Sequence, residues 1–479
     1  MSVKFYNTLS RELEEFKSIE PGKVGMYTCG PTVYNYAHIG NFRAYVFEDL
    51  LRRVLKYAGY DVTQIMNLTD VDDKTIRDSQ AAGKSLNDFT AIYKEAFFDD
   101  LNILRVEPAE EYPAATDNIP EMIELIQILI DKGYGYIGDD GSVYYSIEKF
   151  ECYGCLGRIN LEGQRSGVRI STDEYEKDQA ADFALWKKWE EADGDVWWES
   201  PWGKGRPGWH IECSAMSMKY LGNHFDMHTG GVDNMFPHHD DEIAQSEAAT
   251  GEKYVNYWLH CEHLMVNNGK MSKSKGNFFT LRQLIEKGYT GREVRWLLLN
   301  THYRQKLNFL HAPGEQLEFP GLEEARTALK RLDVFTSRIN DLANGSKATD
   351  WGGLDVVLDK AAARFKAALI EDLNISGAQA ALFDLVREIN RAIDEQGLSQ
   401  KDADIVLSLL RKFDNVLSVL DVDDQQEDEV PVDIQLLADK RQQARKDKNW
   451  SEADRLRDEL KQAGWQIVDT PDGAKVVPL

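Results

Sequence analysis

The hydrophobic pattern of residues 23–66 predicts a strand–helix–strand unit. Residues 23–29 alternate apolar and small side chains, as a β-strand does, and Gly30-Pro31 ends that run. Apolar residues then recur at helical spacing from about Gly40 to Gly59, and residues 62–66 form a second short apolar strand. A strand, a helix and a strand in this order predict the parallel sheet of an α/β protein.

The pattern changes twice further along the chain. Residues 113–204 combine a helix candidate at 119–132 with short strands and turn signals, such as 141–146, and predict an inserted domain. From about residue 322 helical periodicity dominates. One apolar stripe there predicts the core of a helical bundle, and it consists of Val406, Leu409, Leu410, Phe413, Val416, Leu417 and Leu420.

The last fifty residues predict a small separate module. Residues 421–429 hold six acids and no base, which is typical of a solvated linker. A helix with interleaved charges follows, and residues 466–477 predict two short strands about a Pro-Asp-Gly turn. The bases of that helix region are Lys440, Arg441, Arg445, Lys446, Lys448, Arg455 and Arg457.

Composition excludes several classes of protein. Against 56 Lys and Arg stand 81 Asp and Glu, a net charge of −25 over 479 residues, which argues against a protein that coats nucleic acid but not against a local basic groove. No apolar run approaches the roughly 18 residues of a membrane span, and the first residues lack a secretory apolar core. Five cysteines are too few for a disulfide scaffold and predict a reducing, cytoplasmic location.

Two polar motifs are candidates for phosphate binding. His38-Ile39-Gly40-Asn41 lies at a strand-to-helix junction, where free N–H groups and the helix dipole attract anions. The alternative is a solvated helix cap. Lys270-Met-Ser-Lys273-Ser, followed by Lys275, places three lysines within six residues, which favours a loop that closes on a phosphate. An exposed basic turn is the alternative.

Four residues could complete a tetrahedral zinc site. His238 and Glu242 are four apart on a predicted helix and share a face, while Cys29 and Cys213 supply two sulfur ligands. An inert buried Cys213 is the alternative.

The other residues that could bind a metal are not assigned to the zinc site. Cys152 and Cys155 form the only C-x-x-C motif and could bind zinc or act in redox chemistry, but they lack a second pair nearby, which favours two ordinary thiols. We interpret His239, His260 and His263 as structural or surface groups.

Together the two phosphate motifs resemble the paired signatures of class I aminoacyl-tRNA synthetases. Four further segments are similar to the cysteinyl-tRNA synthetase family: Tyr-Thr-Cys-Gly-Pro-Thr-Val-Tyr at 27–34, Asn-Leu-Thr-Asp-Val-Asp-Asp-Lys at 67–74, Gly-Arg-Pro-Gly-Trp-His-Ile-Glu-Cys-Ser-Ala at 205–215, and residues 225–246. The resemblance spans nearly the whole chain. It implies a Rossmann-like catalytic fold in two halves, 1–112 and 205–320, around a connective domain at 113–204. A helical bundle with the acidic linker at 321–429 and an anticodon-region module at 430–479 would follow.

The resemblance also assigns site residues. It implies one zinc per chain on Cys29, Cys213, His238 and Glu242, and a substrate pocket with Thr69, Trp209 and His228. It implies ATP contacts from His38, Gly40, Asn41, Gly230, Asp233, Lys270 and Lys273. Two positions depart from the family pattern: Asn41 stands where His is common, and Asp240-Asp241 stands where Glu-Asn is common.

The implied reaction has two steps. ATP, with Mg²⁺, would activate L-cysteine to cysteinyl-adenylate, which would then be transferred to the terminal adenosine of tRNA(Cys). We expect a monomer that does not bind a membrane. Two alternatives are a ligase that joins the adenylate to an amino sugar, whose family lacks the tRNA-binding tail, and a non-catalytic zinc-bearing RNA-binding paralogue.

Overall fold

The fold was analysed in a computed structural model. It describes residues 2–159, 169–170, 181–271, 277–311, 319–346, 348–423, 432–446, 449–463, 465–470 and 473–478. The chain forms two compact units, Met1–Leu420 and Asp421–Leu479.

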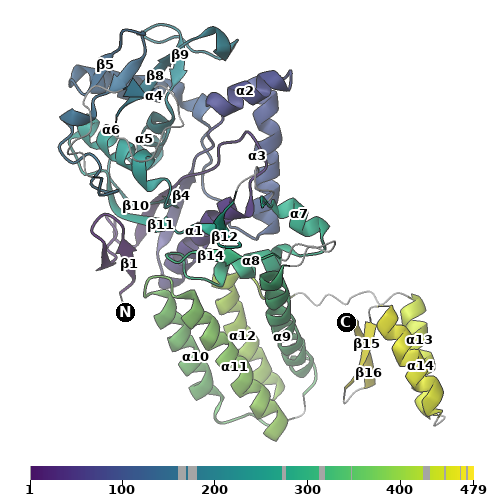
Figure 1. Ribbon diagram of the computed structural model, residues 1–479. Helices are drawn as coiled ribbons and strands as arrows, with labels where there is room; N and C mark the ends of the chain where they lie inside the picture. Colours follow the sequence, from purple (N-terminus) through teal and green to yellow (C-terminus); the bar gives the residue numbers. More distant parts are fainter. Residues whose placement is uncertain are drawn as a thin grey trace. The chain divides into compact units, whose positions relative to one another are not determined.

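The centre of the first unit is a four-stranded parallel sheet in the order β11-β10-β3-β4 (Figure 1). Its strands are β3 (Lys23–Thr28), β4 (Asp61–Met66), β10 (Phe225–Gly231) and β11 (Val255–Cys261). Helix α1 (Ile39–Ala58) connects β3 to β4, and Gly59 caps its C-terminus with φ of 101°. The predicted strand–helix–strand unit and the α/β class are therefore confirmed.

A second sheet lies in the segment between the two halves of the parallel sheet. Its strands follow the order β5-β6-β8-β7, with β9 paired to β8. They are β5 (Gly135–Ile137), β6 (Val143–Tyr145), β7 (Arg169–Ile170), β8 (Asp182–Lys188) and β9 (Gly205–Pro207). Around them lie η1 (Ala115–Asn118), α4 (Ile119–Asp131), η2 (Ile147–Lys149) and η3 (Glu191–Asp193). One apolar core joins this sheet to β3, β10 and β11, so the insertion packs against the parallel sheet.

The remaining elements of this α/β region surround the central sheet. Helices α5 (Trp209–Leu221) and α6 (Asp240–Thr250) flank β10, and a π-helical turn, η4 (Met235–His239), precedes α6. The other elements are β1 (Lys4–Asn7), β2 (Glu12–Glu15), α2 (Asp73–Ala81), α3 (Leu86–Ile103), β12 (Leu264–Val266), β13 (Gly269–Lys270), α7 (Leu281–Glu286), α8 (Gly291–Leu299) and β14 (Leu307–Phe309).

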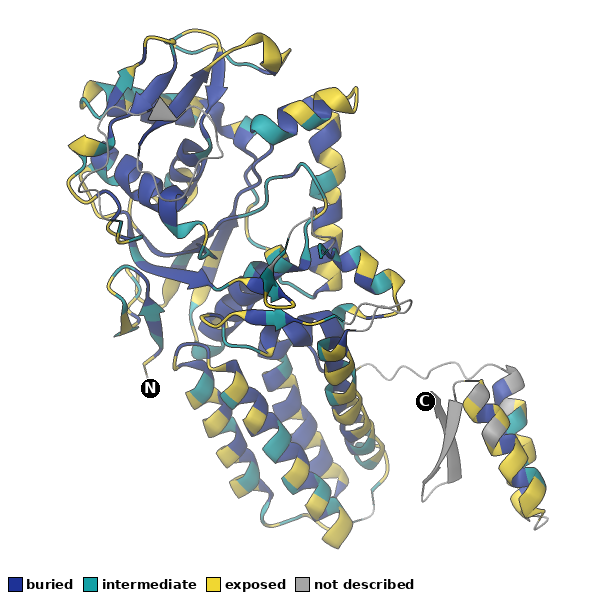
Figure 2. Cartoon of the chain, viewed as in Figure 1, coloured by how far each residue is buried: buried dark blue, intermediate teal, exposed yellow. Residues whose placement is uncertain are grey.

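Four helices complete the first unit as a bundle: α9 (Pro320–Ala343), α10 (Leu354–Leu369), α11 (Ile375–Gln396) and α12 (Gln400–Leu417). Figure 2 shows their buried faces turned toward one another and their exposed faces outward. The predicted stripe of α12 is buried throughout, and Phe413 stacks on Phe365 of α10 with ring centroids 3.9 Å apart. The stripe is bundle core, as expected from its spacing.

The second unit is a helix pair with a hairpin. Helices α13 (Val432–Lys446) and α14 (Trp450–Gln462) pack together through Ile434, Ala438 and Leu460. Strands β15 (Trp465–Thr470) and β16 (Gly473–Pro478) are antiparallel, which confirms the predicted hairpin. Lys448 lies outside the described residues, and so does the part of the acidic run that follows Asp423.

Candidate active site

The candidate site lies at the carboxyl edge of the parallel sheet. Cys29 directly follows β3, Thr69 follows β4, and His228 lies in the second half of β10. The connection from β3 leads to β4 and the connection from β10 leads to β11, so the two neighbouring strands are followed in opposite directions along the sheet. The carboxyl ends of strands at such a point form a natural ligand crevice. Gly30 permits the crossing of two segments there, because a Cβ at this position would lie 1.7 Å from the Asn67 carbonyl oxygen.

Four buried candidate metal ligands from three segments converge in this crevice. The ligand atoms of Cys29, Cys213, His238 and Glu242 all lie within 4.8 Å of one another. His238 Nε2 is 3.2 Å from Glu242 Oε1, yet that oxygen accepts no hydrogen bond among the described residues. Two thiols, an imidazole and a carboxylate are a zinc donor set, and an orphaned buried oxygen beside them fits a bound cation.

Without a metal, the imidazole of this cluster is neutral and both of its thiols are protonated. The pKa of the Cys29 thiol is raised well above its ordinary value by its hydrogen bond with Cys213 and by burial. The same hydrogen bond lowers the pKa of Cys213, but burial and the nearby acids outweigh it, so that pKa is also raised. Burial lowers the pKa of His238 to about 3, leaving a neutral imidazole. Both thiols keep their protons in the absence of a cation, so metal binding would release them.

A histidine network supports these donors. His239 Nε2 lies 3.2 Å from Cys29 Sγ, and a second group of mutually close donors consists of Cys29, His228, His239 and Glu242. His239 Nδ1 contacts His260 Nε2 at 2.8 Å, and His260 Nδ1 contacts Thr8 Oγ1 at 2.9 Å. His239 is fully buried and is pointed at Cys29 by the turn before α6, which agrees with its interpretation as a structural group. His260 is structural, and His263 is exposed, as expected.

His210 is a site residue that the sequence analysis missed. Its Nδ1 lies 2.8 Å from His238 Nδ1, and its Nε2 lies 3.3 Å from Asp241 Oδ2. Burial lowers its pKa to about 3, so this imidazole is neutral as well. Its position directly after Trp209, inside a segment that already carried Cys213, was the only available signal.

The three expected substrate residues occupy different depths. Trp209 is half-buried and stacks on His238, with ring centroids 4.2 Å apart. Thr69 Oγ1 donates to Glu212 Oε2 at 2.9 Å and accepts from Asn67 Nδ2 at 3.2 Å. His228 is fully buried, with Nε2 2.9 Å from Glu242 Oε2, and so lies against the carboxylate of the donor cluster.

The first phosphate motif forms the N-terminus of α1. His38 Nδ1 accepts from the Asn41 N–H at 3.1 Å, and Asn41 Oδ1 accepts from the His38 N–H at 3.0 Å. This reciprocal cap holds both side chains at the helix start, where the dipole favours an anion. A Cβ at Gly40 would lie 2.9 Å from the His38 ring, so glycine also makes room for this histidine.

The flanks of the lysine-rich loop reach the same junction. The Ile39 N–H donates to the Phe279 carbonyl at 3.0 Å, and the His38 ring meets Phe278 edge-on with centroids 5.1 Å apart. Lys270 ends β13, which pairs with β12. Lys273 lies outside the described residues. The described residues on either side of the second motif are therefore neighbours of the first motif, although more than two hundred residues separate them.

The end of β10 lies beside the histidine network. A Cβ at Gly230 would lie 2.9 Å from the His239 ring. Asp233 is exposed in the turn that leads into η4.

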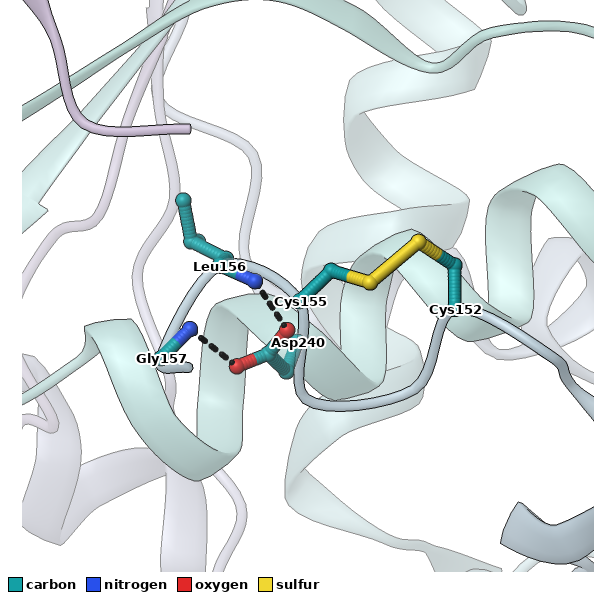
Figure 3. The surroundings of a disulfide bond; sticks show 5 residues. All are labelled: Cys152, Cys155, Leu156, Gly157 and Asp240. Atoms are coloured by element: carbon teal, nitrogen blue, oxygen red, sulfur yellow. Dashed lines mark hydrogen bonds between the residues drawn. A yellow bond between two sulfur atoms is a disulfide. The ribbon is translucent and has the colours of Figure 1, made fainter. Parts of the chain in front are cut away.

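Cys152 and Cys155 are joined in a disulfide, so their interpretation as two ordinary thiols is wrong (Figure 3). The Cys155 N–H donates to the Cys152 carbonyl at 3.1 Å, and this tight turn holds the two Cα atoms 5.4 Å apart. That separation is the usual one for a disulfide. Spacing in the sequence could not reveal the turn.

Fold and signature motifs define a class I aminoacyl-tRNA synthetase. Residues 15–317 match the tRNA synthetases class I (C) catalytic domain, residues 364–421 a DALR domain, and residues 427–475 the cysteinyl-tRNA ligase anticodon binding domain. A methionyl-tRNA synthetase of Mycobacterium tuberculosis is similar in fold at 13% identity, with a TM-score of 0.57 over 83% of this chain and 88% of that one.

Full-length relatives narrow the class. A cysteine–tRNA ligase of Protochlamydia amoebophila is 53% identical over 99% of this chain and 97% of its own length. A cysteine–tRNA ligase of Brachyspira hyodysenteriae is 49% identical over 99% of this chain and 98% of its own length. The chain belongs to the cysteine–tRNA ligase family, which confirms the resemblance seen in the sequence. Among the described helices, none combines the length and apolar composition that a membrane crossing needs.

Proposed function

We infer that this chain activates L-cysteine with ATP and transfers it to the 3′ adenosine of tRNA(Cys). The observation that carries this inference is the cluster of Cys29, Cys213, His238 and Glu242 at the carboxyl edge of the sheet. A thiol-selective centre beside a nucleotide junction suits the activation of cysteine. The match of residues 427–475 to an anticodon binding domain argues against an amino-sugar ligase without a tRNA-binding tail. The intact donor cluster and helix cap argue against a non-catalytic paralogue.

Cys29, Cys213, His238 and Glu242 would hold one Zn²⁺ per chain. When bound, zinc supplies a soft Lewis acid that takes the substrate thiolate in preference to the hydroxyl of serine. An apolar pocket alone separates such isosteres poorly. Trp209, stacked on His238, holds that ligand's ring in place and covers one side of the centre.

Thr69 would accept a hydrogen bond from the ammonium group of cysteine. Its hydroxyl donates to Glu212 and accepts from Asn67, which leaves one lone pair for a donor. The ammonium group is the substrate's only strong donor at neutral pH. Glu212 would therefore orient Thr69 and supply a compensating negative charge.

The α1 junction would bind ATP. His38 and Asn41 would support the α-phosphate from the helix start, with Gly40 between them. Lys270 and Lys273 would stabilise the leaving pyrophosphate, with Mg²⁺ on the phosphates. Gly230 and Asp233 would lie against the adenosine. Here the protein's contribution is positioning and charge stabilisation.

The C-terminal unit would contact the tRNA while the first unit performs both chemical steps. We expect a cytoplasmic monomer.

ATP–pyrophosphate exchange with each of the twenty amino acids tests the proposal. We expect exchange with cysteine alone, together with one zinc per chain by metal analysis. Exchange with another amino acid at comparable efficiency, or none at all in zinc-loaded protein, contradicts it.

A further inference from the structure

The Cys152–Cys155 loop lies directly against the segment that carries two of the proposed zinc ligands. Leu156 and Gly157 donate their N–H groups to Asp240 Oδ1 and Oδ2 at 3.0 and 2.8 Å (Figure 3). Asp240 begins α6 and stands two residues from both His238 and Glu242. Both cysteines are exposed, whereas Leu156 and Asp240 are buried. The two cysteines are therefore open to solvent, while Leu156 and Gly157 are hydrogen-bonded to the helix that carries a proposed zinc ligand.

A second contact links the same loop to His238. Tyr153, which lies between the two cysteines, donates from its hydroxyl to Asp241 Oδ1 at 2.5 Å. The other oxygen of Asp241 lies 3.3 Å from His210 Nε2, and His210 contacts His238 at 2.8 Å. All four side chains are buried. A continuous series of polar contacts thus runs from the disulfide loop to a proposed metal ligand.

Arg11 makes a third connection. Its Nη2 donates to the Leu156 carbonyl at 2.8 Å and lies 3.3 Å from Met235 Sδ, at the start of η4. The loop, the N-terminal hairpin turn and the metal-ligand turn are therefore packed as one assembly.

We propose that Cys152 and Cys155 form a thiol–disulfide exchange site for low-molecular-weight thiols, including L-cysteine, and that its redox state sets how tightly the metal centre is held. This inference rests on the proposed zinc site. Protein disulfides in a reducing compartment are usually transient or redox-sensing, and exposure is what such a role requires.

The exchange is balanced by the substrate itself. One cysteine thiolate attacks an exposed protein sulfur, forming a mixed disulfide and releasing the other protein thiolate. A second cysteine thiolate attacks the mixed disulfide and releases the remaining protein thiolate. The products are the reduced Cys152–Cys155 pair and one cystine, so two electrons pass from two cysteines to the protein. Loss of the cross-link frees the loop that holds Asp240 and Asp241.

The test measures zinc release from the full chain to a chromogenic chelator, in oxidised and reduced protein. Thiol titration of the native protein fixes the redox state, because the other three cysteines are buried. We expect release to be roughly tenfold faster after reduction, the size of effect that outer ligand contacts have on metal affinity. The paired variant Cys152→Ser with Cys155→Ser should release zinc at the reduced rate under both conditions.

Tyr153→Phe is the matched control, because it removes the bond to Asp241 and leaves both sulfurs. We expect the oxidised variant to release zinc faster than the oxidised wild type. The difference in release rate between oxidised and reduced protein should therefore be smaller in the variant. Oxidised protein that binds no zinc overturns the proposed metal centre and this inference with it. Stoichiometric zinc with equal release in both redox states overturns the inference alone. Failure of the disulfide to form also overturns the inference alone. The same holds if Tyr153→Phe keeps the full difference in zinc-release rate between oxidised and reduced protein.

Discussion

Glu212 accepts a hydrogen bond from Thr69, a proposed substrate residue, and its effect on binding should depend on the substrate's amino group. We expect Glu212→Gln to raise the KM for cysteine about tenfold, or ~1.4 kcal/mol, because the charge that complements the ammonium group is lost. Inhibition by 3-mercaptopropionate, which lacks that group, should be unchanged. Thr69→Ser keeps the hydroxyl and serves as the control. Equal weakening of both ligands by Glu212→Gln would mean that the carboxylate only supports the local fold.

Replacing Cys213 should change the zinc content of the protein, whereas replacing Cys152 and Cys155 should not. Cys213→Ser removes a proposed zinc ligand, and we expect metal analysis to find no stoichiometric zinc. Cys152→Ser with Cys155→Ser should still bind one zinc per chain under zinc saturation, although it releases the metal faster. Loss of zinc only in the second variant would place the metal at the C-x-x-C motif and contradict the assignment.

Glu48 is a buried carboxyl group whose ionisation should destabilise the fold. Burial raises its pKa to about 8 from 4.5, although the Thr229 hydroxyl, which donates to it at 2.9 Å, opposes the shift. The folded pKa lies above the unfolded one, so this group costs stability increasingly as pH rises from about 5 to 8. Glu48→Gln should be the more stable protein above pH 8, by roughly 2–4 kcal/mol, with little difference near pH 5. Urea denaturation at both pH values measures the difference in free energy of unfolding between Glu48→Gln and the wild type. A difference that does not grow with pH refutes the prediction.

At the scale of elements, the segment that follows the lysine-rich loop contacts the start of α1. The Phe279 carbonyl accepts from the Ile39 N–H, and the Phe278 ring meets the His38 ring edge-on. We expect Lys273→Ala to lower the rate of adenylate formation by roughly two to three decades, about 2–4 kcal/mol, with cysteine affinity much less affected. The lysine would act on charge that develops as pyrophosphate leaves. A pre-steady-state rate within about twofold of the wild type, less than ~0.5 kcal/mol, would exclude this role.

At the scale of the whole molecule, the two compact units predict separable functions. Leu420 and Val422 are buried, so truncation after Glu429 leaves the packing of the bundle intact. We expect the truncated chain to keep pyrophosphate exchange and to lose most of its aminoacylation efficiency. The lost part includes Lys440, Arg441 and Arg445 on α13, where phosphate contact on this acidic protein is most plausible. Unchanged aminoacylation would exclude a role in tRNA recognition, and loss of exchange would show that the unit is structural.

Local patterning alone identified the β3–α1–β4 unit, the α12 stripe and the C-terminal hairpin. Each depends on side-chain periodicity and turn residues within about twenty positions, and burial on one face enforces that periodicity. The donor types of the zinc site were visible for the same reason, since His238 and Glu242 share one turn of chain. Cys29 and Cys213 were candidates by residue type alone, and the family resemblance implied the same four ligands.

Long-range packing was required for everything that joins distant segments. Cys29 reaches Cys213 only because β3 and β10 are neighbours in the sheet and α5 packs beside them. His210, His239 and the disulfide loop acquire their roles from contacts across 21 to 210 positions, with no repeating pattern to announce them. Periodicity records which face of an element is buried, whereas the partner that covers this face is chosen by the packing of the whole chain.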